Sequence, residues 1–279
     1  MKRCLKVILV FAASSLVLAC MSVFAPTATS APAAAPTDTP ASQGTGMPIV
    51  SLVIPVGLAT NTLTGTVPAF TPQSENEHPV PEYVHISLEC EPYNYCTIHT
   101  GDINVYPAAD LGAKDSRAAD DIGALQKVLA KPDASYSTDD LPGLPPPYAP
   151  MGVALSAQEK VIPFKNGRGI RYLLELKSDV SPIVNDLTYF FSGLTDDGKY
   201  YITGEFGTSL PYLSDDLSSN AAPPGGVPFP TSNNISQVGQ AYDEYMKKIT
   251  NLINSSSADK FDPSLNSLDT LVQSISIKK

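Results

Sequence analysis

The pattern of apolar and polar residues predicts a β-hairpin in the second half of the chain. Residues 187–194 are nearly all apolar or aromatic, as in a central strand that is covered on both faces. The tetrapeptide Thr-Asp-Asp-Gly that follows is typical of a tight turn. Residues 199–206 then alternate between an apolar and a polar face, which predicts the returning strand. A strand is also predicted before the hairpin, where one face carries Ile170, Tyr172, Leu174 and Leu176.

Three further strands are predicted in the first half of the chain. Residues 49–58 form an apolar run that is rich in β-branched side chains. Apolar and polar side chains alternate within 82–90, with Val84 and Ile86 on the apolar side. Residues 96–106 form the third predicted strand, and a short connection joins it to the second.

Helices are predicted where apolar residues recur every three or four positions. Residues 116–130 place their apolar side chains on one face, and Ser116 is the expected N-cap. Residues 234–254 show the same spacing. Asp262 as N-cap and Pro263 at the first helical position predict a shorter helix near the end of the chain.

These elements define the expected fold class. Residues 132–158 are predicted to be a long crossing loop, and residues 274–277 to add a final short strand. The sequence therefore predicts an α+β fold, a mostly antiparallel sheet with helices packed on it, in a single domain over 47–279.

The first nineteen residues have the pattern of an export signal. Lys2, Arg3 and Lys6 make a basic start, and residues 7–19 form an uncharged apolar run that is short for a membrane span. The run ends Val-Leu-Ala-Cys, which resembles the bacterial lipobox, where the signal is cut before a cysteine that carries diacylglycerol. The resemblance implies a lipoprotein signal peptide over 1–19 and lipid on Cys20.

Other processing routes stay open at this end of the chain. Ordinary cleavage after Ala25 or Ala31 would give a secreted protein, although a proline follows each position and the peptidase disfavours it. A retained anchor helix is the third option. Residues 20–46 are rich in alanine, proline, threonine and serine, a composition that predicts a disordered tether.

The charge of the chain restricts its partners. The formal net charge is −10, and removal of three basic residues with the signal would bring it to −13. An acidic chain without a basic cluster is not expected to bind nucleic acid or to dock electrostatically on anionic lipid. We therefore expect contact with the membrane through a lipid anchor, on the extracytoplasmic face, with an envelope protein or ligand as the partner. Two acyl chains or more anchor firmly, whereas one binds only marginally.

Two of the four cysteines remain after Cys4 leaves with the signal and Cys20 takes the lipid. Five residues separate Cys90 from Cys96, and in an oxidising compartment such a pair predicts a local disulfide. Zinc binding is the rival interpretation, but it requires more ligands than two thiols. We expect neither a metal nor another cofactor.

A block of the sequence resembles a known group of proteins. The segments Asn-Gly-Arg-Gly-Ile-Arg-Tyr-Leu (166–173) and Tyr-Phe-Phe-Ser-Gly-Leu-Thr-Asp-Asp-Gly-Lys-Tyr-Tyr (189–201) are similar to a family of uncharacterised bacterial secreted proteins and lipoproteins. The likeness spans roughly residues 100–215 and implies export and a common fold, but no catalytic residue. The order of elements is also faintly similar to Mog1/PsbP-like proteins, which is an analogy of fold alone.

Few residues point to a specific chemistry. His85 and His99 lie on the polar sides of neighbouring predicted strands, and Tyr201 belongs to a chain rich in tyrosine, a residue suited to binding faces. Arg171 is expected to pair with Glu205 or Glu175. These four residues, His85, His99, Arg171 and Tyr201, form the predicted binding surface. The sequence has no Gly-x-Ser-x-Gly nucleophile motif, and we assign no catalytic residue.

The sequence therefore predicts a lipid-anchored extracytoplasmic protein that is a non-catalytic binding or scaffolding module. The alternative is a cell-envelope hydrolase that uses carboxylates. A hydrolase requires titratable groups with shifted pKa values in a pocket, whereas a binding module requires a shallow aromatic patch. The faint Mog1/PsbP-like layout adds assembly support for a membrane complex as a third possibility.

Overall fold

The computed structural model describes residues 46–279 except 75–76, 92–93, 99–100, 145–151, 218–220 and 231–234. The described residues fall within one compact unit. The predicted signal peptide, Cys20, the tether up to residue 45 and His99 lie outside the described residues.

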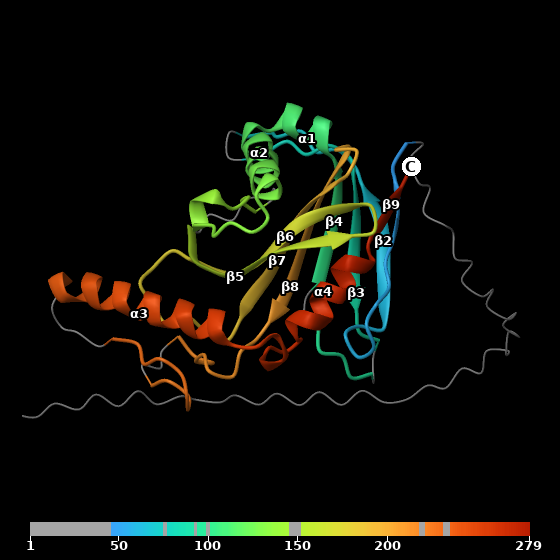
Figure 1. The fold of residues 1–279 in the computed structure, drawn as a ribbon. Helices are drawn as coiled ribbons and strands as arrows, with labels where there is room; N and C mark the ends of the chain where they lie inside the picture. Colours follow the sequence, from blue (N-terminus) through green and yellow to red (C-terminus); the bar gives the residue numbers. More distant parts are fainter. Residues whose placement is uncertain are drawn as a thin grey trace, which may run out of the picture. The chain divides into compact units, whose positions relative to one another are not determined.

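The centre of the fold is a seven-stranded sheet in which every neighbouring pair is antiparallel (Figure 1). The order across the sheet is β2-β3-β4-β8-β7-β6-β5. The strands are β2 (Asn61–Val67), β3 (Tyr83–Glu89), β4 (Gly101–Pro107), β5 (Gly152–Phe164), β6 (Gly167–Lys177), β7 (Leu187–Thr195) and β8 (Tyr200–Thr208). A separate two-stranded ladder pairs β1 (Ile49–Ser51) with β9 (Ser276–Lys278).

Helices cover both faces of this sheet and create two cores. One core joins α1 (Ala108–Lys114) and α2 (Ser116–Ala130) to the face that carries Tyr172 and Phe190. The other core joins α3 (Ile235–Ser255) and α4 (Leu265–Ser274) to the opposite face. Two short 3-10 turns, η1 (Thr138–Asp140) and η2 (Ala258–Lys260), complete the secondary structure. The prediction of an α+β fold with a large antiparallel sheet is confirmed.

Capping residues set where two of the helices begin. The side chain of Asp115 accepts a hydrogen bond of 2.8 Å from the Arg117 N–H and caps α2. The predicted N-cap, Ser116, is therefore the first helical residue. In the same way Ser264 caps α4 by accepting from the Ser267 N–H, whereas Asp262 and Pro263 precede that helix. In each helix the N-cap is therefore a polar residue close to the predicted one, but not the predicted residue itself.

Several elements differ from the expectations. β5 begins inside the predicted loop 132–158. The sequence did not predict this strand, because two register shifts interrupt its alternation of apolar and polar residues. The predicted strand over 49–58 pairs only at Ile49–Ser51. The elements β2 and α1 were not predicted at all.

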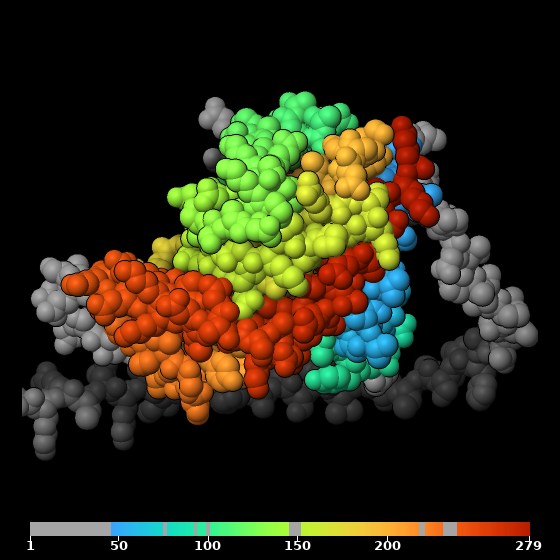
Figure 2. Space-filling view, viewed as in Figure 1, coloured from blue at the N-terminus to red at the C-terminus, as the bar shows by residue number. Residues whose placement is uncertain are grey.

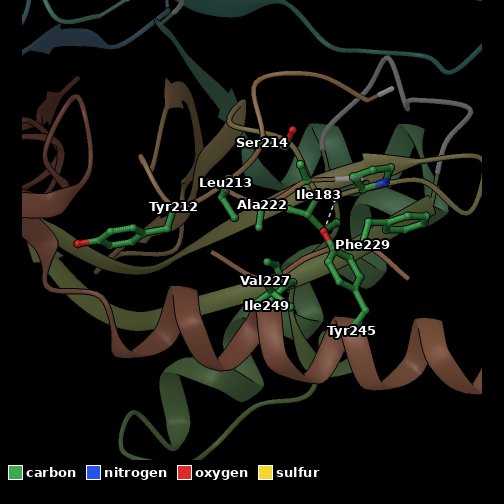
Figure 3. A pocket seen from close by; sticks show the side chains of 11 residues that line it. Ile183, Tyr212, Leu213, Ser214, Ala222, Val227, Phe229, Tyr245 and Ile249 are labelled. Carbon is green, nitrogen blue, oxygen red and sulfur yellow. Dashed lines mark hydrogen bonds between the residues drawn. The ribbon is translucent and has the colours of Figure 1, made fainter. Parts of the chain in front are cut away.

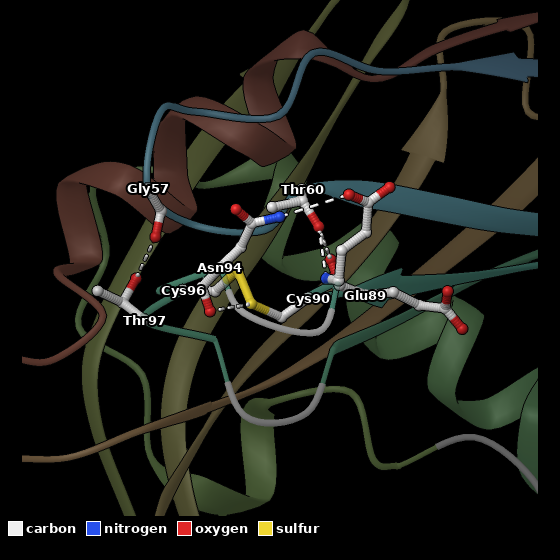
Figure 4. Close-up of a disulfide and its surroundings, with 8 residues drawn as sticks. Gly57, Thr60, Glu89, Cys90, Asn94, Cys96 and Thr97 are labelled. Atoms are coloured by element: carbon white, nitrogen blue, oxygen red, sulfur yellow. Dashed lines mark hydrogen bonds between the residues drawn. A yellow bond between two sulfur atoms is a disulfide. The ribbon is translucent and has the colours of Figure 1, made fainter.

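The predicted disulfide between Cys90 and Cys96 is confirmed, with the sulfur atoms 2.08 Å apart (Figure 4). The described pairing of β3 with β4 begins at Ser87 opposite Asp102, so the cysteines lie in the connecting loop. This loop is tied to the segment before β2, since the Thr97 N–H donates to the Gly57 carbonyl at 3.0 Å. The disulfide thus holds a loop that packs beside the start of β2.

Candidate ligand-binding face

Polar side chains gather on the face of β3, β4 and β8 next to α1 and α2. Strand register places His85 opposite Asn104, and Ser87 opposite Asp102. Asp102 in turn lies opposite Glu205 on β8. Because successive residues of a strand point to opposite faces, these five side chains share one face of the sheet. We name this group the sheet-face cluster: His85, Ser87, Asp102, Asn104 and Glu205.

Hydrogen bonds inside the sheet-face cluster engage the side-chain donors of His85 and Ser87. His85 Nδ1 lies 2.8 Å from Asn104 Oδ1, which requires a proton on Nδ1 when the amide oxygen is the acceptor. The Ser87 hydroxyl donates to Asp102 Oδ1 at 3.0 Å. His85 Nε2 lies 3.5 Å from that same oxygen. The imidazole N–H and the serine hydroxyl are therefore directed at neighbours within the cluster.

Acceptor oxygens of the sheet-face cluster stay available. Among the described residues, no hydrogen bond reaches Asp102 Oδ2 or the Glu205 carboxyl group. The side chains of Asp102 and His85 are 47% and 36% exposed, so solvent and ligands have access to them. The cluster therefore offers carboxylate oxygens to an incoming hydrogen-bond donor.

The electrostatics of the face reflect the two neighbouring carboxyl groups. Burial raises the pKa of Glu205, and the negative charge of Asp102 raises it further. Burial also raises the pKa of the Tyr83 phenol, with Asp102 as the second cause. The Tyr83 ring packs on that of Tyr106, with centroids 4.7 Å apart. An aromatic border thus adjoins the carboxylates.

The order of contacts in the cluster does not match a serine nucleophile with its base. In a serine hydrolase the imidazole stands between the hydroxyl and the carboxylate. Here the carboxylate of Asp102 stands in the middle, with Ser87 and His85 both directed at it. The arrangement is suited to binding donors, and any proton transfer would fall to the carboxyl groups.

The structure separates the residues of the predicted binding surface. His85 belongs to the sheet-face cluster. Tyr201 is 1% exposed and lies beneath α2, where it accepts a hydrogen bond of 2.9 Å from the Ser192 hydroxyl. Arg171 is 4% exposed and lies on the opposite face of the sheet. The expectation that Arg171 and Tyr201 belong to a surface is therefore wrong, because helices cover both faces of the sheet at these positions.

The ion-pair partner predicted for Arg171 is also wrong. Its Nε donates to Asp269 Oδ1 of α4 at 3.2 Å, instead of to Glu205 or Glu175. Tyr189 donates to the same oxygen at 2.9 Å, and Lys160 Nζ lies 2.8 Å from Oδ2. Both oxygens of Asp269 are thus engaged. We name this group the α4 cluster: Lys160, Arg171, Tyr189 and Asp269.

Sequence reasoning missed four members of the sheet-face cluster: Ser87, Asp102, Asn104 and Glu205. Asp102 and Asn104 sit at alternate positions of a predicted strand that follows the strand of His85, so strand alternation gave a signal for them. Glu205 was assigned to the polar side of its strand but was not connected to His85. That connection depends on the pairing of β4 with β8, two strands that are distant in the sequence.

Cavities lie elsewhere in the molecule. One cavity, between the loop around 212–229 and α3, has a volume of about 10 Å³ (Figure 3). It has room for one water molecule at most. A groove of about 480 Å³ runs along the second half of α2 and is lined by residues that include Lys127, Tyr136 and Asp140. The Tyr136 hydroxyl donates to the Val128 carbonyl at 3.1 Å across this groove.

Comparisons with known proteins leave the family open: no family model, no curated protein and no solved structure matches this chain. Within the described ranges, no group of three or more histidine, cysteine, aspartate or glutamate side chains could hold a metal ion. None of the helices in the described part is both long and apolar enough to traverse a bilayer.

Proposed function

We propose that this chain is a lipid-anchored extracytoplasmic binding module whose binding face is the sheet-face cluster. The proposed ligand is a donor-rich cationic group, such as an amine or a guanidinium. The amino-terminal pattern, with Cys20 after a small residue at the end of an apolar run, supports the anchor. The spare carboxylate oxygens of Asp102 and Glu205 support the ligand class.

One observation carries the binding proposal. The donors of His85 and Ser87 are directed at neighbours inside the cluster, whereas two carboxyl groups on adjacent strands keep acceptor capacity on an accessible face. A cation placed between Asp102 and Glu205 would offset their mutual repulsion, and charge-assisted hydrogen bonds are about twice as strong as neutral ones. Their negative charges favour an amine over a neutral polyol.

The ligand class is tested by calorimetric titration with spermidine as the amine probe and maltose as a neutral polyol. We expect saturable binding of spermidine, weakened at least tenfold in the double variant Asp102→Asn, Glu205→Gln. The double variant Asp243→Asn, Glu244→Gln on α3 removes two exposed charges elsewhere and serves as the matched control. Equal affinity of the first double variant and the control would show nonspecific attraction to an acidic protein. Binding of maltose alone would contradict the ligand class.

The anchor is tested separately by detergent phase partitioning of the protein from its native membrane. The wild-type protein is expected in the detergent phase, and the Cys20→Ala variant in the aqueous phase. Recovery of the wild-type protein in the aqueous phase would contradict the anchor and would leave the ligand experiment unaffected.

The raised pKa of Glu205 beside Asp102 favours a second candidate, a cell-envelope hydrolase that uses carboxylates. In this function Glu205 would act as the general acid and Asp102 as the base. It predicts turnover of chromogenic glycosides or esters that Glu205→Gln abolishes without a loss of folded protein. Turnover that persists in Glu205→Gln would exclude this assignment.

A further inference from the structure

The two edges of the large sheet are built differently. The edge strand β5 contains Pro163 and two register shifts, and its side chains include the charged Glu159 and Lys160. Such features obstruct the addition of another strand. The edge strand β2 has none of them: its seven residues, Asn-Thr-Leu-Thr-Gly-Thr-Val, pair with β3 without a shift. In the described part of the chain, β3 is the only strand that pairs with β2.

The segment that contains β2 carries no charged side chain. Residues 47–74 contain no acidic or basic side chain, in a protein whose net charge is −10. The exposed large apolar side chains of this segment are Ile49, Val53, Val56, Leu63 and Phe70. Part of the segment is visible as the blue surface beside the dark red β9 and α4 in Figure 2. Exposed apolar groups beside an unpaired edge mark a site where another chain can bind.

Backbone groups of β2 are available for pairing at alternate residues. Phe70 and Val80 exchange both backbone hydrogen bonds, and they lie in the same register as the β2–β3 ladder. Hydrogen-bonded pairs alternate with non-hydrogen-bonded pairs in an antiparallel ladder. Leu63 and Gly65 therefore direct their N–H and C=O groups away from β3, whereas Thr64 directs its groups toward it.

We propose that β2 pairs with β2 of a second copy of this chain, antiparallel, about a two-fold axis at Thr64. In this register Leu63 of each copy lies opposite Gly65 of the other, and their outward backbone groups hydrogen-bond. The Leu63 side chain is 56% exposed, and a Cβ on Gly65 would meet nothing within 4 Å. The open space over Gly65 accommodates the leucine of the other copy.

The properties of the edge favour a second copy over a different partner. A two-fold axis places each residue of the edge opposite another residue of the same edge, so an edge with charges of one sign would repel its copy. An uncharged edge on an otherwise acidic protein avoids this repulsion. The threonines also match, because Thr62 of each copy lies opposite Thr66 of the other, a cross-strand pair that is favourable in sheets.

Cysteine cross-linking of the full chain in detergent tests the register. Cys4 and Cys20 are replaced by serine in every variant, so that the introduced cysteine is the one free thiol beside the native disulfide. In Thr64→Cys the two new cysteines face each other in a non-hydrogen-bonded pair, with Cα atoms about 4.5 Å apart, which a disulfide can bridge. We expect most of this variant to form a covalent dimer under mild oxidation.

Thr62→Cys and Thr66→Cys are matched controls on the same face of the same strand. Each alone places the two thiols about 13 Å apart, four residue rises along the ladder, and should form no covalent dimer. A mixture of the two should cross-link. Leu63→Lys added to Thr64→Cys should lower the dimer yield at least fivefold. Equal cross-linking of all three single variants, or none with Thr64→Cys, would overturn the proposal.

Discussion

Two polar clusters lie on opposite faces of one sheet, and they differ in burial and in how completely their atoms are paired. In the α4 cluster, Arg171 and Asp269 are each 4% exposed, and both Asp269 oxygens have partners. In the sheet-face cluster, Asp102 has a side chain that is 47% exposed and an oxygen without a described partner. In the α4 cluster a carboxylate lies beside two basic side chains, and in the sheet-face cluster a carboxylate lies beside an imidazole.

This contrast distinguishes a cluster that stabilises the fold from one that is open to a ligand. A buried charge is tolerated only when its partners satisfy it, and its removal leaves an uncompensated charge behind. Replacing an accessible carboxylate costs the protein little stability, because water already solvates that group. We therefore assign the α4 cluster to stability, in contrast to the sheet-face cluster, for which we propose a role in binding.

The largest effect is expected for Asp269→Ala. This change leaves Arg171 buried without its partner, so the free energy of unfolding should fall by about 3–5 kcal/mol, as measured by urea denaturation. Asp259→Ala, at an exposed position of η2, is the control and should change it by less than about 0.5 kcal/mol. Equal effects of the two substitutions would contradict a structural role for Asp269.

Sequence alone predicted the local parts of this arrangement. Strand alternation defined β6 and β8, a continuous apolar run defined β7, and helical spacing defined α2 and α3. The sequence did not predict the α4 cluster, because Arg171 and Asp269 are separated by 98 positions. Sequence alone also did not predict how β2 and β5, the strands at the two edges of the sheet, pair with their neighbours. In β5, Gln158 adopts a positive φ of 59°, and the register shift there hides the alternation.

A smaller loss is expected for Tyr189→Phe. The substitution keeps the ring but removes the hydroxyl that donates to Asp269 at 2.9 Å. A hydrogen bond to a charged group contributes about 1.5–3 kcal/mol, and urea denaturation should show a loss in this range. Tyr83→Phe on the opposite face should have a smaller effect, because its ring is half-buried. If Tyr83→Phe cost more, the assignment of the two clusters would be reversed.

The pH dependence of stability should distinguish the faces further. The pKa of Glu205 is raised in the folded protein, so the folded state binds this proton more tightly than the unfolded chain. The stability from this group is therefore present at acidic pH and is lost as pH rises through the raised pKa. Glu205→Gln should remove this loss and raise the urea midpoint at neutral pH. Glu82→Gln, at an exposed position, should not.

The smallest change in stability is expected for His85→Ala. The imidazole is accessible and bonds to Asn104 at the surface of the cluster, so the free energy of unfolding should change by about 0.5 kcal/mol or less. The same variant should alter spermidine affinity, since the imidazole adjoins Asp102. A loss of stability comparable to that of Asp269→Ala would show that the sheet-face cluster is also structural.

The β1–β9 ladder has a mechanical consequence. The chain enters the described unit just before β1, whose three residues pair with β9. On its other side, β9 is held by Asn166, whose side chain accepts from the Ile277 N–H at 3.0 Å and donates to its carbonyl at 2.8 Å. Tension applied at the amino-terminal end would load this short ladder first. Three residue pairs would then yield before the force reached the seven-stranded sheet.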